Sequence, residues 1–205
     1  MKVLIINGSP REGGNTSIAV EELVKTFKEE GVETDVVCVG KLDVPGCKAC
    51  RACREIGRCV QDDIVNVLSE KLKDSDGIIA ASPVYFASPN ATIKSVMDRL
   101  FFSCPYDLHM KVGASVAVAR RAGTDTTFDV LNKYFTVAGM VVATSDYWNN
   151  VFGWETGDAV KDDEGLMNMR FLARNMTFLM KSIALGKEKY GLPEREPAVM
   201  TNFID

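Results

Sequence analysis

Short, mostly apolar runs alternate with amphipathic stretches along this chain. The runs lie at residues 2–7, 33–39, 77–81, 112–119 and 140–145. A strand covered by helices on both faces of a parallel sheet has this composition. Between the runs, apolar residues recur at helical spacing, as Val20, Leu23 and Phe27 do. The alternation predicts five βα units in a doubly wound α/β fold, with a five-stranded parallel sheet between two layers of helices.

Polar and turn-forming residues between the runs predict where the helices begin and end. Gly31 is expected to follow the first helix as its C′ residue. Asp62 or Asp63 can cap the second helix. Ser88 and Pro89 are expected to be the cap and the first residue of the third. The helices are expected at about 16–30, 64–72, 88–102, 124–138 and 164–186.

Length and composition are those of an ordinary single-domain globular protein. We expect the 205 residues to form one domain, with a cysteine-rich insertion at 40–61 and a C-terminal helix and tail at 164–205. The net charge of −4 gives no general reason to bind nucleic acid or anionic lipid. No apolar run approaches the ~20 residues that span a bilayer, and the first run is too short for a signal peptide. We therefore expect a cytoplasmic protein with no membrane or nucleic-acid partner.

The loop after the first predicted strand is a candidate phosphate site, because doubly wound sheets bind ligands beyond the carboxyl ends of their strands. It leads into a helix N-terminus, whose free N–H groups favour a phosphate. It matches neither the GxxxxGK[ST] pattern of Walker sites nor the GxGxxG pattern of dinucleotide sites. Its side chains able to hydrogen-bond a phosphate are Ser9, Arg11, Asn15, Thr16 and Ser17.

Three groups of residues carry a family resemblance. They are Gly8-Ser9-Pro10-Arg11 with Asn15-Thr16, then Pro83-Val84-Tyr85-Phe86, and then Lys94 with Asp98-Arg99. In this order they resemble the NADPH-dependent FMN reductase and iron–sulfur flavoprotein branch of the flavodoxin-like superfamily. The resemblance covers nearly the whole chain. It implies a flavodoxin-like fold, FMN as the cofactor, and an oxidoreductase or electron-transfer activity.

The resemblance also implies how the chain would hold FMN. The polar loop residues named above would bind its phosphate, and the isoalloxazine ring would lie beside Pro83, Val84, Tyr85 and Phe86, with polar contacts from Ser88 and Asn90. A third wall at 119–123 would include Arg120 and Gly123. For Arg120 and Arg121, contact with FMN, contact with a pyridine-nucleotide phosphate and a solvated surface pair are all open. No catalytic acid or base is assigned, His109 included, because the flavin carries the chemistry.

Four of the six cysteines form a compact C-x2-C-x2-C-x5-C motif, made of Cys47, Cys50, Cys53 and Cys59. In a reducing compartment such spacing favours metal or redox chemistry over disulfides. The motif resembles that of iron–sulfur flavoproteins, which implies that all four ligate one [4Fe–4S] cluster. A zinc site with four thiolates, a dithiol switch, and thiols left after loss of a cluster are the alternatives. Cys38 and Cys104 are interpreted as structural.

Three functions follow from these features. The first is an electron-transfer flavoprotein that takes electrons from ferredoxin through the cluster to FMN. The second is an NAD(P)H-dependent flavin or quinone reductase without a cluster, and the third is a non-enzymatic zinc- or thiol-based redox sensor that binds flavin. The methionine-rich final helix, with Met167, Met169, Met176 and Met180, also favours a homo-oligomer, either a dimer or a tetramer.

Overall fold

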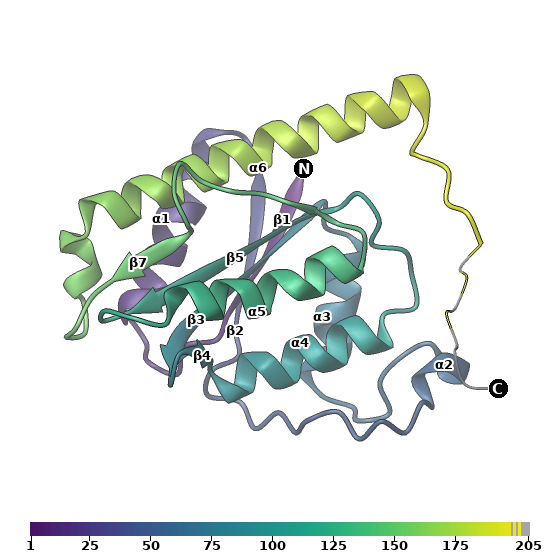
Figure 1. The fold of residues 1–205 in the computed structure, drawn as a ribbon, viewed down its shortest axis with the longest axis horizontal. Coiled ribbons are helices and arrows are strands. Elements are labelled where there is room, and N and C mark those ends of the chain that lie inside the picture. The colour runs from purple at the N-terminus through teal and green to yellow at the C-terminus, as the bar shows by residue number, and fades with distance from the viewer. Residues whose placement is uncertain (198, 200, 202–205) are drawn as a thin grey trace.

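The computed structural model describes residues 1–197, 199 and 201; the rest of the predicted tail, at 198, 200 and 202–205, lies outside the described residues. Parallel strands form a central sheet with the order β2-β1-β3-β5-β6, and helices cover both of its faces (Figure 1). This is the flavodoxin-like doubly wound order, so the predicted fold class is confirmed. The strands are β1 (Lys2–Asn7), β2 (Glu33–Cys38), β3 (Gly77–Tyr85), β5 (Val112–Ala119) and β6 (Val141–Val142).

Five long helices follow these strands, close to their predicted places. They are α1 (Asn15–Glu29), α3 (Ile64–Lys73), α4 (Ala91–Ser103), α5 (Thr124–Val137) and α6 (Asp163–Tyr190). The cysteine segment contains only the short helix α2 (Cys53–Ile56), and a 3-10 helix, η1 (Asp158–Lys161), precedes α6. α6 continues past its predicted end at about 186. Within the part of the chain that the structure describes, no helix is both long and apolar enough to cross a membrane.

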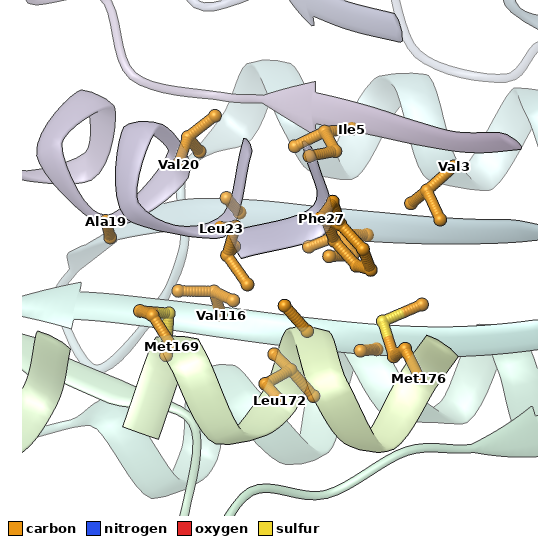
Figure 2. Close-up of a cluster of buried hydrophobic side chains, with 14 of the residues drawn as sticks. Val3, Ile5, Ala19, Val20, Leu23, Phe27, Val116, Met169, Leu172 and Met176 are labelled. Atoms are coloured by element: carbon orange, nitrogen blue, oxygen red, sulfur yellow. The ribbon is translucent and has the colours of Figure 1, made fainter. Parts of the chain in front are cut away.

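Each face of the sheet has its own hydrophobic core, because successive side chains of a strand point to opposite faces. Val3 and Ile5 of β1 pack with α1 and α6, whereas Leu4 and Ile6 pack with α3, α4 and α5. Figure 2 shows part of the first core, with α1 and α6 against the same side of the strands. Burial on both faces explains why the strands are mostly apolar in sequence.

The edge of the sheet beyond β5 differs from the prediction. β6 pairs with the start of β5, and a separate strand, β7 (Asn150–Phe152), pairs with its end. Between them the fully buried Asn149 bonds to β5: its carbonyl oxygen accepts from the Ala117 N–H at 3.0 Å and its Nδ2 donates to the Ser115 carbonyl at 2.9 Å. A buried amide therefore replaces part of the strand ladder, and the single strand predicted at 140–145 is wrong after Val142.

The start of the third predicted helix is also corrected. Ser88–Pro89 form a short strand, β4, that turns back on β3 as a hairpin. α4 is capped instead by Asn90, whose Oδ1 accepts from the Ile93 N–H at 3.2 Å. The Asn90 Nδ2 donates to the Gly8 carbonyl at 2.5 Å. One buried side chain thus caps α4 and fixes the loop after β1, which explains why the helix begins at Ala91.

Candidate functional site

A pocket of about 180 Å³ opens at the carboxyl ends of β1, β3 and β5. Four separate segments meet there: the β1–α1 loop, the end of β3, the end of β5 and the loop after β7. This is the position at which doubly wound sheets bind their ligands. The lining residues are Ser9, Arg11, Asn15, Thr16, Pro83, Val84, Tyr85, Val118, Ala119, Arg120, Gly153 and Trp154.

One end of this pocket is built from the first turn of α1. No side chain caps the helix at its N-cap residue, Gly14, so the first-turn N–H groups keep their capacity to bind an anion. Ser9 is held in a tight turn, in which its Oγ accepts from the Arg11 N–H at 3.2 Å. Its own N–H donates to the Asn7 side-chain oxygen at 2.9 Å. The exposed Arg11 adds positive charge beside the helix terminus.

The side-chain amide of Asn15 is hydrogen-bonded to the loop after β7. Its Oδ1 accepts from the N–H groups of Gly157 and Ala159, each at 3.1 Å, and its Nδ2 donates to the Glu155 carbonyl at 2.9 Å. The amide therefore uses both of its ends to join α1 to the segment 155–159. It lines the pocket by holding the loop after β7 in place.

The β3–β4 hairpin forms a second wall, and its turn is strained. Phe86 and Ala87 have φ values of 49° and 56°, as a two-residue type I′ turn requires, although such turns usually carry Asn or Gly. Phe86 is fully exposed at the tip, and Tyr85 is half exposed. The turn packs against Gly123, where an added Cβ would lie 2.6 Å from the Ala87 Cα. Only glycine allows the hairpin and the β5–α5 loop to approach this closely.

The third wall contains a cation–π pair. The guanidinium of Arg120 lies over the Trp154 ring, 4.0 Å from its centroid. Both side chains are exposed, so the pair shields little surface, but it gives Arg120 a preferred position at the pocket mouth. Arg121 is exposed and lies outside the lining set.

Eight of the residues predicted to contact the flavin line the pocket, whereas five do not: Ser17, Phe86, Ser88, Asn90 and Gly123. Ser17 accepts a hydrogen bond at 3.3 Å from the Asn7 side chain. Phe86 points into solvent, Ser88 pairs with Tyr85 in the hairpin, and Gly123 supports Ala87. Gly153 and Trp154 of the loop after β7 also line the pocket, and so does Val118, which sequence reasoning missed because it lies inside a predicted strand.

The four motif cysteines line one small pocket of about 20 Å³, a space for roughly one water molecule. Cys47 and Cys50 are exposed, and Cys53 and Cys59 are half-buried. Ala49 and Arg51 have φ values of 52° and 62°, a conformation that ordinarily costs about 1–2 kcal/mol for a non-glycine residue. Two left-handed residues between the cysteines curl the segment so that all four face the same space.

These four cysteines line a common pocket. Among the described residues, no three Cys, His, Asp or Glu side chains are arranged around the position of a single metal ion. Cys38 and Cys104 lie outside this pocket; Cys38 is exposed at the end of β2, and the Cys104 thiol donates to the Tyr106 carbonyl at 3.3 Å.

A buried arginine that sequence reasoning did not place at this site holds the cysteine segment. Arg99 of α4 is 1% exposed, and its guanidinium forms two bonds to Asp63 at 2.7 and 2.9 Å. Burial opposes its charge, but the hydrogen bonds with Asp63 and Cys59 raise its pKa, so the guanidinium stays charged. The sequence does contain one sign of this role: Arg99 is a charged residue next to Val96 and Leu100, on the buried face of a predicted helix.

The sequence profile of one protein family matches the part of the chain that forms the pocket at the strand ends. Residues 1–155 match the profile described as NADPH-dependent FMN reductase. The chain belongs to this family. It is therefore an FMN-binding flavoprotein of the oxidoreductase class, and the matched residues include every segment that lines the pocket at the strand ends.

Relatives of similar length carry a more specific name. An iron–sulfur flavoprotein of Methanocaldococcus jannaschii is 37% identical over 194 residues, which cover 89% of this chain and 99% of the relative. An iron–sulfur flavoprotein of Methanosarcina thermophila is 33% identical over 194 residues, which cover 92% of this chain and all of the relative.

Solved structures agree on the fold. RosB with a bound riboflavin-phosphate intermediate superimposes with a TM-score of 0.69 at 16% identity, over 99% of this chain and 92% of that one. An archaeal flavodoxin gives a TM-score of 0.60 at 16% identity, over 88% of this chain and 99% of that one. At these identities the likeness shows the flavodoxin-like fold.

Proposed function

We propose that this chain is an iron–sulfur flavoprotein, which carries electrons one at a time from a [4Fe–4S] cluster on Cys47, Cys50, Cys53 and Cys59 to FMN. The observation that carries the proposal is the meeting of these four cysteines at one pocket, in a chain that also has a flavin pocket. Near-full-length relatives with the name iron–sulfur flavoprotein support it.

The pocket at the strand ends suits FMN in its chemistry. The uncapped N-terminus of α1 with Ser9, Thr16 and Arg11 would take the phosphate. Apolar and aromatic groups from β3 and the loop after β7 would take the ring. At about 180 Å³ the pocket is smaller than the roughly 300 Å³ at which enclosed ligand sites begin. We infer that one edge of the ring stays outside, where a second redox group can approach it.

The cysteine pocket suits a cluster in its donor set, since four thiolates are the usual ligands of [4Fe–4S] centres. Its present space of about 20 Å³ is too small to hold one. The segment around Cys47 and Cys50 is exposed, and we infer that it is displaced outward on loading while Cys59 stays fixed. A bound cluster would supply one-electron chemistry, and the protein would control its position and access to water.

The electron donor is proposed to be a small acidic redox protein, with ferredoxin as the expected example. Lys48, Arg51 and Arg54 are exposed and interleave with the cysteines. They would attract an acidic partner to the face where the cluster lies.

We also infer a homo-oligomer. The cysteine pocket includes Phe102 and Ser103 at the end of α4, whereas the flavin hairpin precedes its start. A helix of 13 residues separates them by about 20 Å. A second copy that placed its cysteine segment on the exposed rings of Tyr85, Phe86 and Trp154 would shorten that path. Sedimentation equilibrium tests this: the wild type is expected to associate and Phe86→Ser to weaken the association.

A second candidate is an NAD(P)H-dependent flavin or quinone reductase without a cluster. The family profile is described as NADPH-dependent FMN reductase, and the exposed Arg120 and Arg121 could meet a nucleotide phosphate. Rapid bleaching of the flavin by NADPH or NADH in iron-free protein would favour it.

Absorption spectra with iron and sulfide assays, on protein purified without oxygen, separate these functions. We expect flavin bands on a broad brown absorption, with about four irons per FMN. Cys50→Ser is expected to lose the iron, and the matched Cys38→Ser, in an exposed cysteine outside the pocket, is expected to keep it. Flavin without iron would contradict the cluster and favour the reductase, zinc would favour a sensor, and unchanged iron in Cys50→Ser would contradict the ligand set.

A further inference from the structure

Cys59 is the motif cysteine held by both α3 and α4, whereas the Cys53 thiol meets α4 through one bond to the Phe102 carbonyl at 3.8 Å. Asn66 of α3 clamps its backbone: the Cys59 N–H donates to the Asn66 Oδ1 at 3.1 Å, and the Asn66 Nδ2 donates to the Cys59 carbonyl at 3.1 Å. The Arg99 Nε and Nη2 donate to the Cys59 sulfur at 3.4 and 3.3 Å. Cys47 and Cys50 have no such contact with a helix and lie in an exposed, irregular segment.

All three nitrogens of the Arg99 guanidinium donate hydrogen bonds at the cysteine segment. Besides the sulfur and the two bonds to Asp63, it donates to the Pro45 carbonyl at 3.2 Å and to the Gln61 carbonyl at 3.0 Å. It therefore fastens the chain on both sides of the cysteine motif to α4. Its side chain is fully buried and that of Asp63 is about a quarter exposed, so both the geometry and the charge pairing are shielded from solvent.

We propose that Arg99 is the positioning residue of Cys59 and that it sets the reduction potential of the cluster through its two hydrogen bonds to that sulfur. The inference rests on the proposed function. Hydrogen bonds to ligand sulfurs withdraw negative charge and make a cluster easier to reduce. The charge of Arg99 itself is largely neutralised by Asp63, so the hydrogen bonds carry the effect in the native protein.

Two substitutions in the same ion pair separate this role from a structural one. Arg99→Lys keeps the charge but lacks the planar fork that reaches Cys59 and Asp63 together, so the potential is expected to become more negative. Asp63→Asn can still cap α3 and leaves the charge of Arg99 without its partner, so the potential is expected to become more positive. If Arg99 and Asp63 only held the loop in place, both substitutions would shift the reduction potential in the same direction.

The test is a redox titration of the cluster followed by its electron paramagnetic resonance signal, in the wild type and three variants. Arg58→Lys is the matched control, since Arg58 is exposed and bonded to Asp62 with no contact to a thiol, and its potential is expected to stay at the wild-type value. Opposite shifts for Arg99→Lys and Asp63→Asn would support the proposal. Unchanged potentials, or shifts of one sign, would overturn it.

The outcomes also distinguish this inference from the function on which it rests. A wild-type protein without iron or a cluster signal contradicts the proposed function itself. A wild-type signal with an unshifted Asp63→Asn contradicts only the role of Arg99, and this comparison stands even if Arg99→Lys does not fold.

Discussion

Replacing Gly123 by alanine tests whether the contact between the β3–β4 hairpin and the β5–α5 loop shapes the pocket at the strand ends. Gly123 has a φ of 87°, and an added Cβ would lie 2.6 Å from the Ala87 Cα, 2.9 Å from the Ala87 Cβ and 3.0 Å from the Val84 Cγ1. Two of these atoms belong to a turn that is already strained. The hairpin must therefore move away from the loop, and Val84 of the pocket wall moves with it.

The expected cost has two parts. A left-handed alanine costs about 1–2 kcal/mol, and inserting a methyl group into a packed contact costs about 1–3 kcal/mol. We expect Gly123→Ala to lower the free energy of unfolding by roughly 2–5 kcal/mol and to weaken FMN binding by about tenfold or more, since each ~1.4 kcal/mol is a factor of ten. Urea unfolding measures the first effect, and quenching of FMN fluorescence on titration measures the second.

Gly31→Ala is the matched control. Gly31 has a φ of 73°, follows α1, and has no atom within 4 Å of an added Cβ, so only the conformational cost of about 1–2 kcal/mol applies. Its FMN affinity is expected to equal that of the wild type. If the two alanine variants lose equal stability and bind FMN equally well, the close contact between Gly123 and the hairpin does not shape the pocket.

Three further substitutions test other walls and the pH dependence. Asn15→Ala removes three hydrogen bonds to the segment 155–159. It is expected to lower the free energy of unfolding, measured in urea, by about 2–3 kcal/mol. A loss of stability no larger than that of an ordinary surface substitution would contradict the role of Asn15 in joining α1 to this segment. Trp154→Ala removes the ring beneath Arg120, and FMN titration is expected to show about fivefold weaker binding, with Trp154→Phe close to wild type. Burial, and then a hydrogen-bonded carboxylate, raise the pKa of Tyr134 from 10.0 to about 12. The native state therefore holds this proton more tightly than the unfolded chain, so stability is lost as pH rises through that interval. Tyr134→Phe is expected to flatten this loss in urea melts, and an unchanged pH slope would refute the assignment.

The alternation of strands and helices was predictable because burial on both faces forces apolar residues onto successive strand positions. Val3 and Ile5 differ in their helical partners from Leu4 and Ile6, but every one of them is fully buried. The split edge was not predictable, since a buried Asn149 that replaces ladder bonds has the same local sequence signal as a loop asparagine. The hairpin was missed because its turn carries Phe86 and Ala87 in place of the usual turn residues.

The candidate site was predictable where the loop alone decides it. Ser9 and Arg11 lie between a strand end and a helix, Thr16 lies in the first turn of that helix, and the fold places all three in the pocket. Long-range roles had no local signal: Asn15 serves a segment 140 residues later, and Arg99 reaches Cys59 across 40 residues. Such pairs depend on how segments far apart in the sequence pack together, which periodicity does not encode.

Counting electrons on full anaerobic reduction tests the central claim most directly. Bound FMN takes two electrons and a [4Fe–4S] cluster takes one more. Titration of the purified protein with dithionite, normalised to its FMN content, is predicted to require three electrons per flavin, with the brown absorption and the flavin bands both lost. An end point at two electrons per flavin, in protein with its full FMN content, would contradict the assignment of the four cysteines to a redox cluster.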